Sequence, residues 1–370
     1  MNRRIAGACL LCFVTPLLSA ETDHGRLLHE NAQSYTRVIR LSDRSLLASF
    51  HDTNGMVFYR SADEGKSFQF LSRYNERTDP KTKLGGQAMF EVEPGRVLLA
   101  FNIYPVKFDS GQHLKVAESR DAGKTWQAIA EPEPGFTVWN WEPEFIRSAD
   151  GKLQLYYAWA EKPGMLAIFS QKIVRRESAD GGKTWGQRIV AVEKDNHGMP
   201  VITKMDGVYY MAVERYQEHG QVFVLTSHDG KTWADGAPML TDSGWMFSTP
   251  ALTSAGGSLF GMGMYYKKRE GAKRGEEAHA RNGQVILRST DRGRTWTEMP
   301  APFTYTQTVS KSAIILDDKC KTNWSPALLP LSDKELLLMT TSEITKPRSE
   351  RWGVGAIPKP GAGAKPHDVH

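Results

Sequence analysis

This chain of 370 residues has few cysteines, few long apolar runs and no large excess of charge of one sign. Only three cysteines occur, and Cys9 and Cys12 lie in an amino-terminal leader, so we expect Cys320 to be the single cysteine of the mature chain and no internal disulfide to form. After residue 20, no segment offers the roughly 20 apolar residues that a transmembrane helix needs, so membrane insertion is not expected. Lysine and arginine number 47 against 42 acidic residues, and this balance gives no reason to expect nucleic-acid binding.

Motifs for metals and cofactors are missing as well. His219, His279 and His367 lack the spacing of metal ligands, and neither a zinc motif nor a phosphate-binding glycine loop occurs. We therefore expect no metal and no other cofactor. With 40% hydrophobic and 24% charged residues, the chain should bury a full core, and we expect a monomer.

The first 20 residues have the pattern of an export signal. Arg3 and Arg4 precede the apolar run 5–18, and the small pair Ser19-Ala20 closes it. The sequence therefore predicts a cleavable signal peptide over residues 1–20 and a mature protein in the periplasm or outside the cell.

One octapeptide pattern, Ser-x-Asp-x-Gly followed by a basic residue, Ser or Thr, and an aromatic residue, occurs five times. The fourth copy is one residue shorter, and the aspartates lie 49 to 62 residues apart at Asp63, Asp121, Asp180, Asp229 and Asp291. Such a segment predicts a hairpin turn, in which the Asp carboxylate accepts hydrogen bonds from turn amides and Gly adopts the positive φ of the reversal. The terminal aromatic residue is then free to pack between sheets.

Six strand–turn–strand patterns accompany the octapeptides. Five of them precede a copy, and the sixth, around Ser332-Asp333, has no copy after it. Because each interval holds four short strands, the pattern predicts an all-β, six-bladed β-propeller over residues 21–357. The segment around Leu27-Leu28 would close the ring as the outer strand of the sixth blade. We expect residues 358–370, rich in Pro and Gly, to form a flexible tail.

The octapeptide resembles the Asp-box, or bacterial neuraminidase (BNR), repeat of sialidase-like propellers. The resemblance covers almost the whole mature chain and implies the same six-bladed fold. It also implies that the boxes are structural turns away from the catalytic face.

The candidate site lies on the face opposite the boxes, where the first strand of each blade begins and the second ends. Four of the six first strands were expected to begin with a residue followed by proline, because a proline costs no ladder hydrogen bond at that point. These pairs are Glu142-Pro143, Met199-Pro200, Thr249-Pro250 and Ser325-Pro326. In this register, Glu142 and Glu214 aim toward the mouth of the central channel from neighbouring blades.

Two facing carboxylates in an aromatic-lined cleft are what glycoside hydrolysis needs, one as acid and base and the other as nucleophile or water activator. Mutual repulsion and burial would separate their pKa values. The structural alternative is that both are rim carboxylates paired with Arg147, Arg215 or backbone amides.

A second resemblance favours catalysis. The segment Trp141-Glu142-Pro143 and the later run Gly198-Met199-Pro200 leading to Val213-Glu214 are similar to the exo-acting arabinanases of glycoside hydrolase family 93. The resemblance implies an exo-acting, retaining glycoside hydrolase that removes terminal sugars from an oligo- or polysaccharide, with Glu142 and Glu214 as its catalytic pair.

Two other functions stay open. In an exo-sialidase, Arg37, Arg215 and Arg269 would hold a carboxylate, Tyr265 or Tyr266 would be the nucleophile, and Asp52 would be the acid. In a non-catalytic carbohydrate-binding propeller, the same mouth would be a lectin site.

Further polar and aromatic side chains were expected to line the mouth and contact substrate, and residues 267–282 were expected to form a solvated loop that could cover it. The predicted substrate-binding residues are Arg37, His51, Asp52, Gln87, Asn102, Trp141, Trp159, Arg215 and Tyr265.

Overall fold

The computed structural model describes eleven stretches of the chain, and the backbone alone at 245–247 and 265–267. The stretches are 24–33, 35–105, 111–134, 138–160, 170–193, 196–215, 221–240, 245–267, 285–303, 325–342 and 348–359. The predicted leader, residues 1–20, and the tail beyond 359 lie outside them. No helix long and apolar enough to cross a membrane occurs among the described residues.

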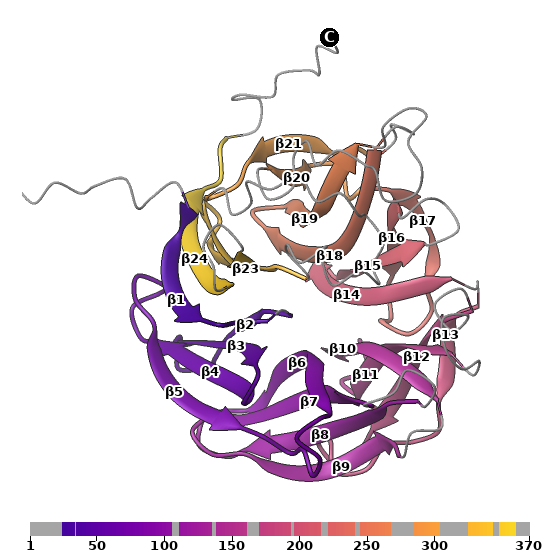
Figure 1. Cartoon of the computed structure of the whole chain (residues 1–370). Coiled ribbons are helices and arrows are strands. Elements are labelled where there is room, and N and C mark those ends of the chain that lie inside the picture. Colours follow the sequence, from indigo (N-terminus) through magenta and orange to yellow (C-terminus); the bar gives the residue numbers. More distant parts are fainter. Residues whose placement is uncertain are drawn as a thin grey trace, which may run out of the picture.

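Six four-stranded antiparallel sheets are arranged as blades around a common axis (Figure 1), which confirms the predicted six-bladed propeller. Blade one contains β2 (Arg37–Arg40), β3 (Leu46–Asp52), β4 (Gly55–Ser61) and β5 (Gln69–Tyr74). Blade two contains β6 (Lys83–Glu93), β7 (Arg96–Tyr104), β8 (His113–Ser119) and β9 (Gln127–Glu133). Blade three contains β10 (Trp139–Arg147), β11 (Leu153–Ala160), β12 (Lys172–Ser178) and β13 (Ile189–Val192).

The remaining blades follow the same plan. Blade four contains β14 (His197–Met205), β15 (Val208–Arg215), β16 (Gln221–Ser227) and β17 (Ala234–Pro238). Blade five contains β18 (Trp245–Ala255), β19 (Ser258–Lys267), β20 (Val285–Ser289) and β21 (Thr297–Pro300). Blade six contains β22 (Ala327–Ser332), β23 (Glu335–Ser342), β24 (Ser349–Ala356) and β1 (Arg26–Glu30).

The ring closes where the sequence predicted. Strand β1 pairs antiparallel with β24, with Leu27 opposite Arg351, so the amino-terminal strand completes the last blade. The two ends of the described chain are thereby joined by hydrogen bonds within one sheet, in which β1 is the outer edge strand.

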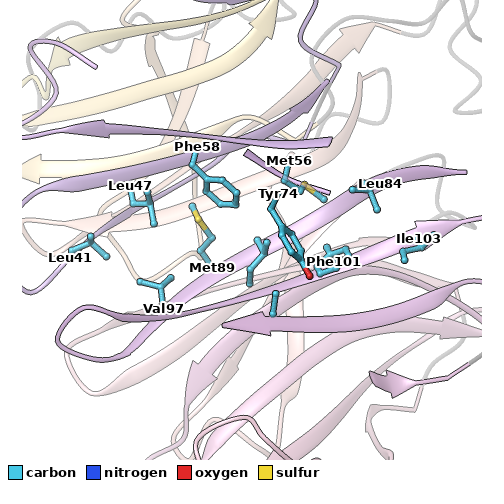
Figure 2. Packing of buried hydrophobic residues seen from close by; sticks show 12 residues of the cluster. Leu41, Leu47, Met56, Phe58, Tyr74, Leu84, Met89, Val97, Phe101 and Ile103 are labelled. Carbon is cyan, nitrogen blue, oxygen red and sulfur yellow. The ribbon is translucent and has the colours of Figure 1, made fainter. Parts of the chain in front are cut away.

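The core lies between blades. Figure 2 shows the cluster at the junction of blades one and two, where Leu47 and Phe58 meet Met89 and Phe101. Comparable clusters fill the other five junctions of the ring. Inner strands are therefore packed on both faces, which explains why β3 is buried at every position and why such strands appear as continuous apolar runs in the sequence.

The five octapeptides form the predicted turns. In the first, Asp63 Oδ1 accepts a hydrogen bond from the Ser67 amide at 2.9 Å, and Gly65 has a φ of +85°. The shorter fourth copy makes the same turn, because Asp229 Oδ1 accepts from the amides of Lys231 at 2.7 Å and Thr232 at 2.8 Å. The box aromatic of blade two, Trp126, stacks on Phe58 of blade one at 4.5 Å between ring centroids. The boxes therefore have a structural role.

The start of the inner strand differs from the prediction in most blades. In blades two to five the first strand begins several residues earlier, and the pairs Gly86-Gln87, Glu142-Pro143, Met199-Pro200 and Thr249-Pro250 lie at interruptions in the pairing register. Proline is tolerated there because a bulge, like a strand start, leaves an amide without a ladder partner. The prediction that Glu142-Pro143, Met199-Pro200 and Thr249-Pro250 begin their strands was therefore wrong, whereas Ser325-Pro326 directly precedes β22.

All six blades share this conformation at the mouth of the channel. Near the start of its innermost strand, each blade has one residue with a positive φ between +47° and +60°, and we call these six the bulge residues: Tyr35, Gly86, Glu142, Met199, Thr249 and Ser325.

Candidate active site

Glu142 is the bulge residue of blade three. Its φ is +47°, the ring of its neighbour Pro143 fixes the φ of that residue, and the register of β10 against β11 shifts between Trp141 and Glu144. A non-glycine residue in this region costs about 1–3 kcal/mol, and such strain persists only where the surroundings determine the conformation. The bulge removes Glu142 from the alternation of the strand and buries its side chain, which is 7% exposed.

The carboxyl group of Glu142 has partners on two other blades. Tyr35 of blade one donates its hydroxyl hydrogen to Oε1 at 3.0 Å, and the backbone amide of Met199 in blade four also donates to this carboxyl. Burial, and next the charge of Glu214, raise the pKa of Glu142 to about 8, against the lowering effects of Tyr35, Arg37 and the Met199 amide. Glu142 is therefore a carboxyl group that holds its proton at neutral pH.

Glu214 lies near the end of β15, opposite Gly198 of β14, and is 1% exposed. Its Oε1 accepts a hydrogen bond from the backbone amide of Thr249. A Cβ at position 198 would lie 2.7 Å from Nε2 of the buried Gln171, so a larger residue there would require the Gln171 side chain to move. The second carboxyl is thus positioned by close packing of blades three, four and five.

The two glutamates are held in the same way. Each carboxyl accepts a hydrogen bond from the amide of the bulge residue in the following blade, Met199 for Glu142 and Thr249 for Glu214. Glu142 and Glu214 are close enough for the charge of one to raise the pKa of the other. The structure thus brings the predicted pair together at the mouth of the channel.

Three predicted substrate-binding residues join this pair through blade one. His51 stacks against Tyr35, with ring centroids 6.5 Å apart. Gln87 donates from Nε2 to the carbonyl oxygen of Tyr35. Arg37 donates from Nη1 to Ser325 Oγ at 2.7 Å, and its charge attracts Glu142. These residues hold Tyr35 and a cation beside the first carboxyl.

Asn102 and Trp141 lie on either side of the same region. Asn102 is fully buried and donates from Nδ2 to the carbonyl oxygen of Asn140 at 3.2 Å, so it links blades two and three behind the bulge residues. Trp141, directly before Glu142, is half-buried and stacks on Trp139 with ring centroids 5.5 Å apart. Trp141 also packs partly against the core between blades three and four.

Asp52 and Arg215 make their contacts outside the pair. Asp52 follows His51 on the strand and so faces the other way; Arg73 bonds its Oδ1 at 2.6 Å and His29 lies 3.2 Å from its Oδ2. Burial alone would raise the pKa of Asp52, but these bonds and the Asn54 amide hold it below its usual value. Arg215 binds Asp235 at 2.9 Å and His197 at 2.8 Å.

The other two predicted residues do not add to the described site. The ring of Trp159 is half-buried against the core between blades two and three, and the guanidinium of Arg188 lies 4.0 Å from its centroid. The side chain of Tyr265, the residue Arg269 and the loop 267–282, apart from the backbone of Lys267, fall outside the described parts of the chain.

Two residues that the sequence reasoning missed belong to the site. Tyr35 is the bulge residue of blade one, equivalent in register to Glu142, and this equivalence was the signal available in the sequence. Glu144 follows Glu142 by two residues on β10; burial raises its pKa to about 7, and the charge of Arg37 acts against that rise. The short spacing Glu142-Pro143-Glu144 was the signal for the second residue.

The fold and this site define a class: a six-bladed propeller of the sialidase-like kind, with a buried carboxyl pair at the end of the channel opposite the box turns. A family model described as the BNR repeat-like domain matches residues 53–266, and the chain belongs to this family. No curated protein matches the chain in sequence.

Solved structures with the same fold include enzymes that act on arabinose-containing sugars and sialidases. The α-L-arabinanase of Penicillium chrysogenum, in complex with arabinobiose, is 19% identical, covers 90% of this chain and 98% of its own, and has a TM-score of 0.65. An α-L-arabinofuranosidase of Fusarium graminearum is 20% identical over 91% and 98% of the two chains, with a TM-score of 0.64. A sialidase of Trypanosoma rangeli is 14% identical over 89% and 55%, with a TM-score of 0.55. These likenesses confirm the resemblance in fold that the motifs predicted.

Proposed function

We propose that the protein is an exported, exo-acting and retaining glycoside hydrolase that removes terminal sugars from a glycan, as the arabinanase-like motifs imply. The single observation that carries this proposal is the buried pair Glu142 and Glu214, in which burial and the charge of Glu214 raise the pKa of Glu142 to about 8. The structural neighbours support a sugar substrate, since arabinobiose is bound to one of them.

The unequal environments assign the roles. Glu142, with its pKa raised to about 8, is the acid that gives its proton to the leaving oxygen. Glu214 is then the carboxylate that attacks the anomeric carbon and forms a glycosyl ester as the glycosidic bond breaks. In the second step Glu142, now ionised, takes a proton from water, and the hydroxide oxygen displaces Glu214 from the sugar.

A panel of substrates tests the proposal most directly. Aryl α-L-arabinofuranoside and linear arabinan should be hydrolysed, and a sialoside should not. Glu142→Gln and Glu214→Gln should each lower kcat by about a hundredfold or more, the usual effect of removing an acid, base or nucleophile. Glu118→Gln is the matched control, because Glu118 is a buried carboxylate bonded to Arg96 and Arg120, on the side of the boxes.

Sialidase activity is the second candidate, and the hydrogen bond between Tyr35 and Glu142 favours it, since that chemistry pairs a tyrosine with a glutamate. Release of sialic acid from the sialoside would establish it. Tight sugar binding without turnover of any substrate, unchanged in both glutamine variants, would instead identify a carbohydrate-binding propeller.

A further inference from the structure

Gly86 differs from the other five bulge residues because it has no side chain. It belongs to blade two, which lies between blades one and three in the ring (Figure 1). The bulge residues of those two blades meet, since the Tyr35 hydroxyl donates to Glu142 Oε1 at 3.0 Å. Blade two contributes no bulge side chain to this meeting point, so other groups of blade two face it.

Two polar side chains of β7 converge on the bulge at Gly86. A Cβ at position 86 would lie 2.7 Å from Asn102 Oδ1 and 3.1 Å from the Tyr104 hydroxyl oxygen. The same point lies 3.4 Å from the backbone nitrogen of Glu142. Asn102 and Tyr104 therefore face one small region directly beside the first residue of the carboxyl pair.

Tyr104 is held there by a second glycine. It pairs with Lys83 at the end of β7, and a Cβ on Gly85 would lie 3.1 Å from Tyr104 Cε2 and 3.4 Å from His51 Cε1. Tyr104 is half-buried, and its hydroxyl makes no hydrogen bond with the part of the chain that the structure describes. Burial, and next the charge of Glu142, raise the pKa of Tyr104 above its usual value, so the hydroxyl is a neutral donor.

Asn102 offers the complementary acceptor. Its side chain is 0% exposed, and Nδ2 donates to the backbone and side-chain oxygens of Asn140. Oδ1 is buried and accepts no hydrogen bond from the described residues, although buried acceptors are nearly always paired with protein, water or ligand. A donor and an acceptor on the same region match the two hydrogen-bonding roles of one hydroxyl group.

We propose that Tyr104 and Asn102 bind one hydroxyl group of the sugar whose glycosidic oxygen receives the proton of Glu142. The Tyr104 hydroxyl donates to the sugar oxygen, and the sugar hydroxyl donates its own hydrogen to Asn102 Oδ1. A carboxylate has no hydrogen to donate to Oδ1, so this subsite selects a neutral sugar. The inference rests on the proposed function for the choice of substrate, and it adds to that function a group that recognises the sugar.

Deoxy sugars combined with a tyrosine variant test this subsite. The probes are methyl α-L-arabinofuranoside and its three monodeoxy analogues. Their dissociation constants are measured by ligand-observed NMR on the full chain carrying Glu214→Gln, which should not turn them over, with and without Tyr104→Phe. Phenylalanine keeps the ring that packs on Gly85. Tyr209→Phe is the matched control, because the Tyr209 hydroxyl bonds the Arg147 carbonyl at 2.9 Å and its ring packs on the box glycine Gly230.

Tyr104→Phe should weaken binding of the parent glycoside about threefold to tenfold, the usual effect of losing one neutral hydrogen bond. The analogue that lacks the bound hydroxyl should bind the protein with Tyr104 intact more weakly by at least this factor, since it leaves Asn102 Oδ1 unpaired. Tyr104→Phe should have almost no further effect on that analogue, because the contact is already lost. The other two analogues should respond as the parent does, and Tyr209→Phe should change none of the four constants.

Three results would overturn the subsite. They are an affinity for the parent that Tyr104→Phe does not lower, an equal loss for all four glycosides, as a purely structural role would give, and no binding of any of them. Hydrolysis of arabinan by the wild type alongside any of these would leave the proposed function standing. Loss confined to the ligands that keep one particular hydroxyl supports the subsite, and if the wild type then hydrolyses no glycan, the proposed function alone has failed.

Discussion

Glu350 is a buried carboxyl group that should make the fold less stable as the pH rises. It lies on β24 of blade six, is 0% exposed, and is bonded to two hydroxyls, Thr36 Oγ1 at 2.7 Å and Thr341 Oγ1 at 3.0 Å. Burial raises its pKa from 4.5 to about 8, although both threonines act to lower it. Since no cation compensates that burial among these contacts, the protonated form is the one the folded state prefers.

The sign follows from proton binding. Between pH 4.5 and about 8 the folded state holds a proton on Glu350 that the unfolded state has released, so the free energy of unfolding decreases with rising pH. The stabilisation that this proton gives to the folded state is fully present below pH 4.5 and is lost by about pH 8. Its slope is about 1.4 kcal/mol per pH unit, which gives about 5 kcal/mol over the whole interval.

Glu350→Gln should remove this slope. Glutamine has the same shape and can exchange hydrogen bonds with both threonine hydroxyls, so the variant and the wild type should have similar stability near pH 5. At pH 8 the variant should be more stable by several kcal/mol, about the amount calculated above. Urea unfolding followed by tryptophan fluorescence at pH 5, 6, 7 and 8 measures the difference, and the slopes due to Glu142 and Glu144 cancel between the two proteins.

Glu118→Gln provides a comparison with the opposite sign. Burial raises the pKa of Glu118, but Arg120 and Arg96 hold it below its usual value, so its stabilisation is present above that value and is lost in acid. This variant should therefore lose most stability at neutral pH. If the difference between wild type and Glu350→Gln were constant from pH 5 to pH 8, the proposed protonated state of Glu350 would be wrong.

Three further predictions concern the site. Tyr35→Phe removes the hydroxyl that favours ionised Glu142, so the basic limb of kcat/KM should move to higher pH; a limb that stays in place would show that the bond is absent in solution. Gly86→Ala should lower the free energy of unfolding in urea more than Gly95→Ala does. Both glycines have a positive φ, but only at position 86 would a Cβ lie 2.7 Å from Asn102 Oδ1. Equal losses of stability would contradict the packing argument. Proton NMR of the first product should detect the retained anomer, and an inverted one would exclude direct attack by Glu214.

The fold could be predicted because its signals are local and repeated. Each box fixes a turn within eight residues, and the spacing between boxes leaves room for only four strands. The bulges could not be placed in the same way. A proline is compatible both with the first residue of a strand and with a bulge, so Glu142-Pro143 alone does not distinguish them.

The site was predictable in part, and strand geometry explains which part. Neighbouring residues on a strand face opposite sides of the sheet. Only one residue of His51-Asp52, and only one of Glu214-Arg215, can therefore face the site. The sequence analysis included both members of each pair. In the structure His51 and Glu214 are at the site, while Asp52 and Arg215 bind Arg73 and Asp235.

The six bulge residues explain how a repeated scaffold carries a site in only some of its blades. Five of the six bulge residues carry a side chain, Gly86 being the exception, and Met199 and Thr249 each contribute a backbone amide to a carboxyl of the blade before. The amide is supplied whatever the side chain is, so in the proposed mechanism Met199 and Thr249 would support catalysis without any catalytic side chain of their own. Chemistry then depends on which side chains occupy the equivalent positions. A glutamate occurs at one bulge and at one second-strand end, and their neighbours supply the amides, the tyrosine and the cation that make the two carboxyls unequal.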